Sequence, residues 1–221
     1  MRVRTVPVLL GLCLAMLAAR VSAAPKKQHV IVLGKWTFAQ WNVGPAEDRP
    51  LPLKVRALYV DDRLREFTLG EPHDVTDRLF VVRRAFRLND QLPADKKPRW
   101  RWERGGWLMV DRFSGRITPL NLPLFDSFHT SAAWFRDYTG YCGVSEDGEK
   151  LYAMVAQLGR KKPIVKQEIG ATIQGDMPDA QCDTPEWQRA PVRVTFRPHA
   201  GPSVTFTVRG HVADLLSDSD E

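Results

Sequence analysis

Residues 192–209 read VRVTFRPHAGPSVTFTVR, and this stretch decides the fold class. Apolar and polar side chains alternate on both sides of the segment PHAGPS at 198–203. Strict alternation is typical of a strand with one buried face, and a cluster of Gly, Pro and Ser is typical of a turn. The stretch therefore predicts a β-hairpin made of residues 192–197 and 204–209.

Similar runs occur along most of the chain and predict further strands. We expect these strands at residues 30–38 (interrupted by Gly34), 53–60, 64–69, 79–88 and 163–173. The strands at 53–60 and 64–69 are expected to form a hairpin across Asp61 and Asp62. Residues 89–99, NDQLPADKKPR, predict a polar, proline-containing loop.

Three more hairpin-like units are predicted in the middle of the chain. They join residues 100–102 to 107–111 around Arg104-Gly105-Gly106, 107–111 to 116–120 around Phe113-Ser114-Gly115, and 132–144 to 150–157 around Asp147-Gly148. Helices are expected only as short segments, at residues 122–128 or 185–189. The predicted fold class is all-β: an antiparallel meander of hairpins that forms a sandwich or partial propeller-like sheets.

The first 24 residues, MRVRTVPVLLGLCLAMLAARVSAA, have the layout of a secretory signal peptide. Two arginines precede an apolar run at residues 6–19, and Val-Ser-Ala at 21–23 matches a cleavage position. The run is short for a hydrocarbon core about 30 Å thick, which disfavours an uncleaved anchor. We expect cleavage after Ala23 or Ala24 and a periplasmic or secreted protein.

Cleavage changes the charge balance of the chain. The sequence has 32 Lys and Arg against 26 Asp and Glu; removing the three arginines of residues 1–24 leaves 29 basic residues, a net charge of +3. Nucleic acid is therefore not expected as a partner. The mature chain is expected to be one all-β domain at residues 25–212, followed by an acidic disordered tail at 213–221, with no membrane-spanning segment after cleavage.

Two cysteines, Cys142 and Cys182, remain after cleavage. An even pair of cysteines in an exported protein predicts one disulfide, whereas two buried free thiols are the alternative. Closing a loop of about 40 residues stabilises a fold by about 4 kcal/mol in the chain-entropy model.

Two segments resemble the hairpins of β-propeller blades. Residues 108–118, LMVDRFSGRIT, resemble the strand, tight turn and strand that end a blade, and residues 143–153, GVSEDGEKLYA, resemble a hairpin inside a blade. A propeller contains at least four blades of roughly 40–45 residues, and the rest of the chain shows no such repeat. The resemblance implies antiparallel meanders, and it assigns no ligand and no catalytic residue.

Tryptophan and arginine concentrate in one part of the sequence, which makes it the candidate binding surface. The proposed binding residues are Trp100, Trp102, Trp107, Arg83, Arg84, Arg99 and Arg101. They belong to a basic stretch at 78–104 that also holds Arg78, Arg87, Lys96, Lys97 and Arg104. Exposed indole faces stack on sugars or cations, and arginines bind anions. The alternative is simple strand alternation, with the tryptophans in the core and the arginines in solvent.

Other polar clusters offer weaker sites. His73, Asp74 and Asp77 lie close in sequence, but they fit a turn equally well. Asp176, Asp179 and Asp183 lack the alternate spacing of a compact calcium loop. We find no G-x-S-x-G nucleophile elbow, zinc pattern, phosphate loop or dinucleotide fingerprint, so no metal, cofactor or catalytic residue is assigned.

These observations predict an exported, non-enzymatic binding protein of the cell envelope or extracellular space. Its partner is expected to be another protein, a glycan or an anionic polymer, bound on a sheet face rich in Trp and Arg. The alternative is a small envelope hydrolase whose histidine and carboxylate side chains converge in a pocket.

Overall fold

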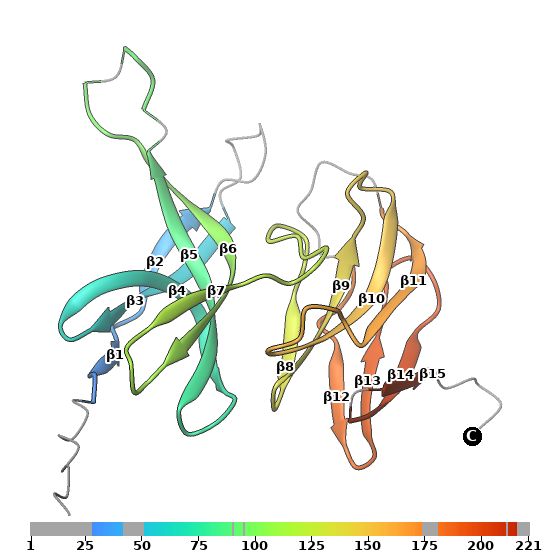
Figure 1. Cartoon of the computed structure of the whole chain (residues 1–221). Coiled ribbons are helices and arrows are strands. Elements are labelled where there is room, and N and C mark those ends of the chain that lie inside the picture. Colours follow the sequence, from blue (N-terminus) through green and yellow to red (C-terminus); the bar gives the residue numbers. More distant parts are fainter. Residues whose placement is uncertain are drawn as a thin grey trace, which may run out of the picture.

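The computed structural model describes residues 28–41, 51–89, 91–94, 96–173, 181–210 and 212–215. The described residues contain β-strands and no helix, and the strands form three antiparallel sheets arranged in two lobes (Figure 1). The predicted all-β class is therefore confirmed. The part of the chain that is described contains no helix long and apolar enough to cross a membrane. The predicted signal peptide lies outside the described residues.

The first lobe is a seven-stranded sheet in the order β1-β3-β4-β5-β6-β7, with β2 also paired to β3. Its strands are β1 (Ile31–Leu33), β2 (Thr37–Trp41), β3 (Leu51–Val60), β4 (Arg63–Asp74), β5 (Leu79–Asn89), β6 (Trp100–Asp111) and β7 (Ile117–Leu120). The hairpin of β5 and β6 projects beyond the rest of this sheet (Figure 1).

The second lobe contains two four-stranded sheets, ordered β11-β10-β9-β8 and β12-β13-β14-β15. Their strands are β8 (Ala132–Phe135), β9 (Tyr138–Val144), β10 (Lys150–Gln157), β11 (Val165–Ala171), β12 (Glu186–Arg189), β13 (Val192–Phe196), β14 (Val204–Arg209) and β15 (Val212–Leu215). The last strand includes residues 213–215, so the sheet extends three residues beyond the expected domain boundary at 212.

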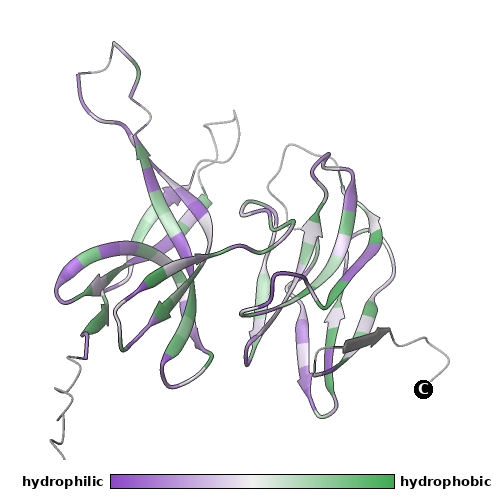
Figure 2. Ribbon diagram, in the orientation of Figure 1, coloured by the Kyte–Doolittle hydropathy of each residue, from purple (hydrophilic) through white to green (hydrophobic). Residues whose placement is uncertain are grey.

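The two sheets of the second lobe pack face to face as a sandwich. Alternate residues of β10, among them Ala153 and Val155, form one buried core with Val194, Phe196 and Phe206 of the facing sheet. Figure 2 shows apolar and polar residues alternating along the strands, the pattern on which the sequence argument depends. Of the two architectures expected from the sequence, the second lobe forms the sandwich.

The predicted disulfide is confirmed and lies in this core. Cys142 of β9 is bonded to Cys182, which precedes β12, so the bond ties one layer of the sandwich to the other. Both cysteines are buried among the apolar side chains of the sandwich core.

The hairpins with clear turn chemistry are confirmed. Val194 lies opposite Phe206 in the hairpin that was read from 192–209. The hairpins β3–β4, β6–β7 and β9–β10 also form where they were expected, with Val60 opposite Arg63, Val110 opposite Ile117, and Leu151 opposite Val144.

The predicted hairpin around Arg104-Gly105-Gly106 is wrong, because residues 100–111 form the single strand β6. The glycines lie at an irregularity where Arg83 pairs with Trp107 but Ala85 pairs with Arg104, which places one extra residue in β6. A Cβ on Gly105 would lie 3.1 Å from the Arg84 Cβ, so close approach of the strands explains this glycine.

Three further boundaries differ from the prediction. Residues 132–144 divide into β8 and β9 at a tight turn where Arg136 has a positive φ of 54°. Residues 30–38 divide into β1 and β2, and both strands pair with β3. The expected short helices are absent from the described residues: 122–128 consists of turns, and 185–189 contains strand β12, because Trp187 and its neighbours pair with β13.

The two lobes contact each other through polar and aromatic groups. His73 of β4 donates from Nε2 to the main-chain oxygen of Arg136 at 2.8 Å, and its ring stacks on Trp134 of β8. Trp107 of β6 meets the same Trp134 ring edge to face, at 5.4 Å between ring centroids. The connecting segment 121–131 packs on both sides, with Phe128 against Trp41 and Phe125 against Tyr141.

Candidate functional site

The candidate site lies where β5 and β6 leave the body of the first sheet. The strands pair without interruption from Ala85 opposite Arg104 to Asn89 opposite Trp100. Residues directly opposite each other in an antiparallel pair point to the same face of the sheet. This register places Arg87 opposite Trp102 and puts both side chains on one face.

Arg87 is an exposed arginine surrounded by three aromatic rings. Its guanidinium carbon lies 5.1 Å from the Trp100 ring centroid, 5.4 Å from that of Trp102 and 5.4 Å from that of Phe67. No carboxylate of the described residues forms an ion pair with it. The rings hold the guanidinium by cation–π attraction, and the residue stays exposed to solvent.

The exposure of the two tryptophans differs. Trp100 is 55% exposed, whereas Trp102 is half-buried and packs edge to face on Phe67, with 4.9 Å between their centroids. The indole of Trp100 is therefore largely open to solvent, whereas the ring of Trp102 is packed against Phe67. Of the three tryptophans predicted as a platform, these two both lie beside Arg87.

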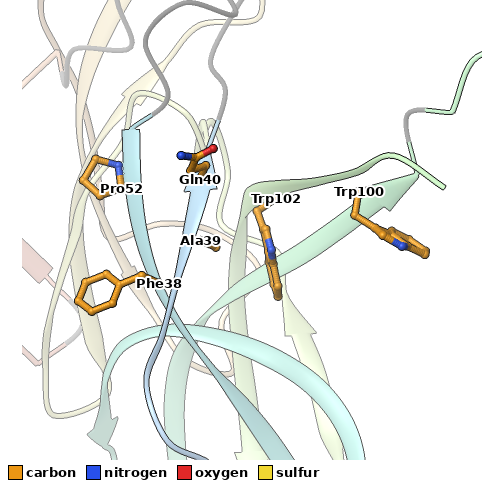
Figure 3. A pocket seen from close by; sticks show the side chains of 6 residues that line it. All are labelled: Phe38, Ala39, Gln40, Pro52, Trp100 and Trp102. Atoms are coloured by element: carbon orange, nitrogen blue, oxygen red, sulfur yellow. The ribbon is translucent and has the colours of Figure 1, made fainter. Parts of the chain in front are cut away.

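A groove adjoins this cluster. It encloses about 630 Å³ and is lined by Phe38, Ala39 and Gln40 of β2, Pro52 of β3, and the tryptophans Trp100 and Trp102 of β6 (Figure 3). Phe38 is 78% exposed, so the groove has an apolar rim on the β2 side as well. Figure 3 shows β2 and the β6 tryptophans on opposite sides of this space.

A second arginine lies deeper along β6. The Arg104 guanidinium carbon is 4.2 Å from the ring centroid of Trp41, a buried residue at the end of β2. Burial lowers the pKa of Arg104. Within the described residues Arg104 has no carboxylate partner, so it adds positive potential beside the groove.

The arginines predicted as binding residues make contacts within the chain. Arg83 donates from Nη2 to the Ser127 main-chain oxygen at 2.7 Å, which makes it a contact to the connecting segment. Arg84 pairs with Glu66 and Arg101 pairs with Glu103, at 2.9 and 2.8 Å. Arg99 is exposed in the loop beside Trp100, and its main-chain N–H donates to Asn89. Arg87 and Arg104 therefore carry the positive charge of the site.

Trp107 is placed apart from the other two tryptophans. It is half-buried against Trp134 of the second lobe, and its indole N–H is buried without a partner among the described residues. It belongs to the contact between the lobes, so the structure brings together Trp100 and Trp102 but not Trp107.

The other polar clusters do not converge. His73 binds a main-chain oxygen, while Asp74 pairs with Arg112 at 2.6 Å. Asp183 lies 3.1 Å from His199, but Asp176 and Asp179 lie outside the described residues. No group of three or more His, Cys, Asp or Glu side chains able to hold a metal ion occurs in the described ranges.

A smaller hollow near the connecting segment contains one histidine and one carboxylate. It encloses about 380 Å³, and its lining includes Asp126, His129 and Thr172. His129 Nε2 is 3.9 Å from Asp126 Oδ2, which is too long for a hydrogen bond, and Asp126 Oδ1 accepts the Phe128 main-chain N–H at 2.7 Å. The pair therefore lacks the geometry of a base with its orienting carboxylate.

Sequence reasoning missed Phe38, Gln40 and Phe67, and it counted Arg87 only as a member of the basic stretch. A partial signal was present. The predicted loop 89–99 joins two neighbouring strands, but a symmetric connection would put residue 88 opposite 100 and Arg87 opposite Arg101. The structure pairs Asn89 with Trp100 and Arg87 with Trp102, one residue away from that register. No such signal links β2 to this site, since the approach of β2 to β6 depends on the curvature of the whole sheet.

No protein family, curated protein or solved structure matches this chain.

Proposed function

We propose that this chain is an exported, non-enzymatic binding protein that binds an anionic partner on the first lobe. The observation that carries the proposal is the position of Arg87: an exposed guanidinium held by three aromatic rings, without a carboxylate partner among the described residues, beside an open groove. A guanidinium fixed in this way keeps its charge and its donor geometry for an incoming carboxylate, phosphate or sulfate.

The surrounding groups favour the same class of partner. Arg104 adds a second positive charge, and Trp100 and Phe38 offer exposed aromatic surface on either side of the groove. Aromatic residues and arginine are the types most enriched at binding hot spots. A partner with negative charges and some apolar or ring surface would satisfy both features.

Export is supported by two independent features. The first 24 residues match a signal peptide, and the Cys142–Cys182 disulfide is typical of oxidising compartments. We propose a periplasmic or secreted location. The intact mass of the accumulated protein tests it: loss of the first 23 or 24 residues supports export, and a full-length mass contradicts it.

The binding proposal is tested with polymers of different charge. Intrinsic tryptophan fluorescence is followed while poly-L-glutamate, a carboxylated polysaccharide and neutral dextran are added at low and high salt. We expect the anionic polymers to bind with an affinity that falls as salt rises, and dextran to give no response. Equal binding of dextran, or no response to any anionic polymer, would contradict the proposal.

The envelope hydrolase is the second candidate, and the hollow around Asp126 and His129 is the observation that favours it. The 3.9 Å separation between this histidine and carboxylate gives it weaker support than the arginine–aromatic cluster receives.

A further inference from the structure

The groove beside Trp100 separates β2 and β6, which are not paired with each other. Four antiparallel pairings, from β2 through β3, β4 and β5 to β6, relate the two strands, so they have the same sense in the order of the sheet. They approach each other where Arg104 lies over Trp41, and the groove opens beyond that point. β6 pairs with β7 only from Trp107 to Val110, and no other described strand pairs with Trp100 or Trp102 on this side.

The main chain of β2 directs polar groups at the groove. The Gly34 N–H donates to the Ala57 oxygen at 2.8 Å, so Ala57 of β3 points toward the side of β1 and β2. Main-chain groups along a strand point alternately to its two edges, so Leu53 and Val55 point the same way as Ala57. Their partners in β2 are Ala39 and Thr37. Phe38 and Gln40 therefore point their N–H and C=O groups away from β3 and toward the groove.

Pro52 fits this assignment. It lies opposite Gln40, has no N–H and has no partner in β4. A proline is tolerated where its missing donor faces away from a pairing strand.

The main chain of β6 presents its polar groups from the other side. The Arg112 N–H donates to the Arg78 oxygen at 2.8 Å, so residues of even number in β5 point toward β6. The main-chain N–H and C=O groups of Phe86 and Leu88 thus point toward those of Glu103 and Arg101 in β6. The N–H and C=O groups of Trp100 and Trp102 then point away from β5, into the groove.

We propose that this groove binds an extended acidic polypeptide segment of a partner protein, which enters as an additional strand between β2 and β6. A strand that runs opposite to both edges would pair antiparallel with each of them, and unpaired strand edges are ready templates for such addition. Every second side chain of the added strand would face the Arg87 and Trp102 side of the sheet. The arginine charges therefore favour acidic residues at alternate positions. The proposal rests on the anion-binding function proposed above and names its partner class.

A polypeptide fits the groove better than a glycan does. The outward groups of Phe38, Gln40, Trp100 and Trp102 follow the alternation of donors and acceptors in a peptide main chain. A glycan could bind the arginines and stack on the indole surface, but it lacks the alternating N–H and C=O groups that would pair with the main chains of β2 and β6.

The test uses a peptide of alternating threonine and glutamate, labelled for fluorescence anisotropy, with the mature full chain. Gln40→Pro removes one outward N–H without removing a hydrogen bond to β3, and Gln40→Ala changes only the side chain. We expect Gln40→Pro to bind about tenfold more weakly than Gln40→Ala. A peptide N-methylated at alternate positions is also expected to bind about tenfold more weakly than the unmodified peptide, which tests the proposal even if the proline variant does not fold.

Three outcomes would overturn strand addition. The first is equal binding of Gln40→Pro and Gln40→Ala, together with equal binding of the two peptides. The second is tighter binding of a carboxylated polysaccharide than of the peptide. The third is a dimer of the chain, seen by sedimentation without peptide, that Gln40→Pro dissociates, because the occupant is then a second copy. If Arg87→Gln still weakens anion binding in these cases, the proposed function stands and only strand addition fails.

Discussion

The Arg83 guanidinium donates a 2.7 Å hydrogen bond to the main-chain oxygen of Ser127, which joins strand β5 to the segment between the two lobes. The same side chain donates from Nε to the Gly105 oxygen at 3.3 Å. Burial, with a smaller contribution from the nearby Arg104 charge, lowers the pKa of Arg83 to about 10. Arg83 therefore braces the connecting segment instead of presenting its charge to a partner.

Replacing Arg83 tests this structural role. Arg83→Ala is expected to lower the free energy of unfolding by about 2 kcal/mol, because two carbonyls lose a charged donor. Hydrogen exchange at Phe128 and Thr130 should become faster. Arg84→Ala is the control, since the half-exposed pair of Arg84 with Glu66 contributes at most about 1 kcal/mol. Equal effects of the two substitutions would contradict the role of Arg83 as a brace.

The disulfide contributes to the stability of the second lobe. The double variant Cys142→Ser, Cys182→Ser should lose about 4 kcal/mol of unfolding free energy, because the unfolded chain regains the freedom of a loop spanning 40 residues. Urea denaturation followed by circular dichroism measures the loss. Wild-type protein in reductant provides the comparison and should show a similar loss, and an unchanged midpoint in both would contradict the prediction.

Two turn glycines should respond differently to the same substitution. Gly115 and Gly148 both have positive φ, +63° and +75°, so alanine at either position costs about 1 kcal/mol. At Gly115 the added Cβ would also lie 2.8 Å from Val60 Cγ1, whereas nothing lies within 4 Å at Gly148. Thermal denaturation should therefore show a larger destabilisation for Gly115→Ala than for Gly148→Ala. A larger destabilisation for Gly148→Ala would contradict the close packing of Gly115 against Val60.

Asp111 should make stability depend on acid pH. Its hydrogen bond with Arg78, helped by the main-chain N–H groups of Phe113 and Ser114, holds the pKa of Asp111 well below its usual range. Because the folded pKa lies below the unfolded value of about 3.9, the stabilisation is present above that pH and is lost as pH falls through the folded pKa. Urea midpoints measured from pH 7 downward should fall less steeply for Asp111→Asn than for wild type. Parallel curves would contradict the prediction.

Much of the fold follows from local sequence. The hairpins at 192–209 and around Asp147-Gly148 formed as expected, because turn residues and alternation specify the same register. The pair Gly105-Gly106 led to a wrong prediction of a turn, because glycine is typical both of turns and of β-bulges. What separates the two is a partner strand long enough to pair across it, and β5 supplies that partner.

The candidate site was predictable only in part. Trp100 and Trp102 were identified from their pattern, but Trp107 lies beyond the irregularity in β6 and meets Trp134 of the other lobe. The predicted arginines were assigned by composition, which does not reveal that Arg84 and Arg101 have carboxylate partners. Arg87 differs from them only through the strand register, and the β2 side of the groove depends on long-range curvature.

Arg87, held by Trp100, Trp102 and Phe67, is the residue proposed to bind the anionic partner. The most direct measurement is the affinity of poly-L-glutamate for wild type, Arg87→Gln and Arg116→Gln, taken by fluorescence titration at constant salt. Arg116 is an exposed arginine beside the β6–β7 turn and lies outside the cluster, so it controls for net charge. We predict a loss of about tenfold for Arg87→Gln and an unchanged affinity for Arg116→Gln. Equal affinities for the two variants would show that Arg87 does not bind the anion.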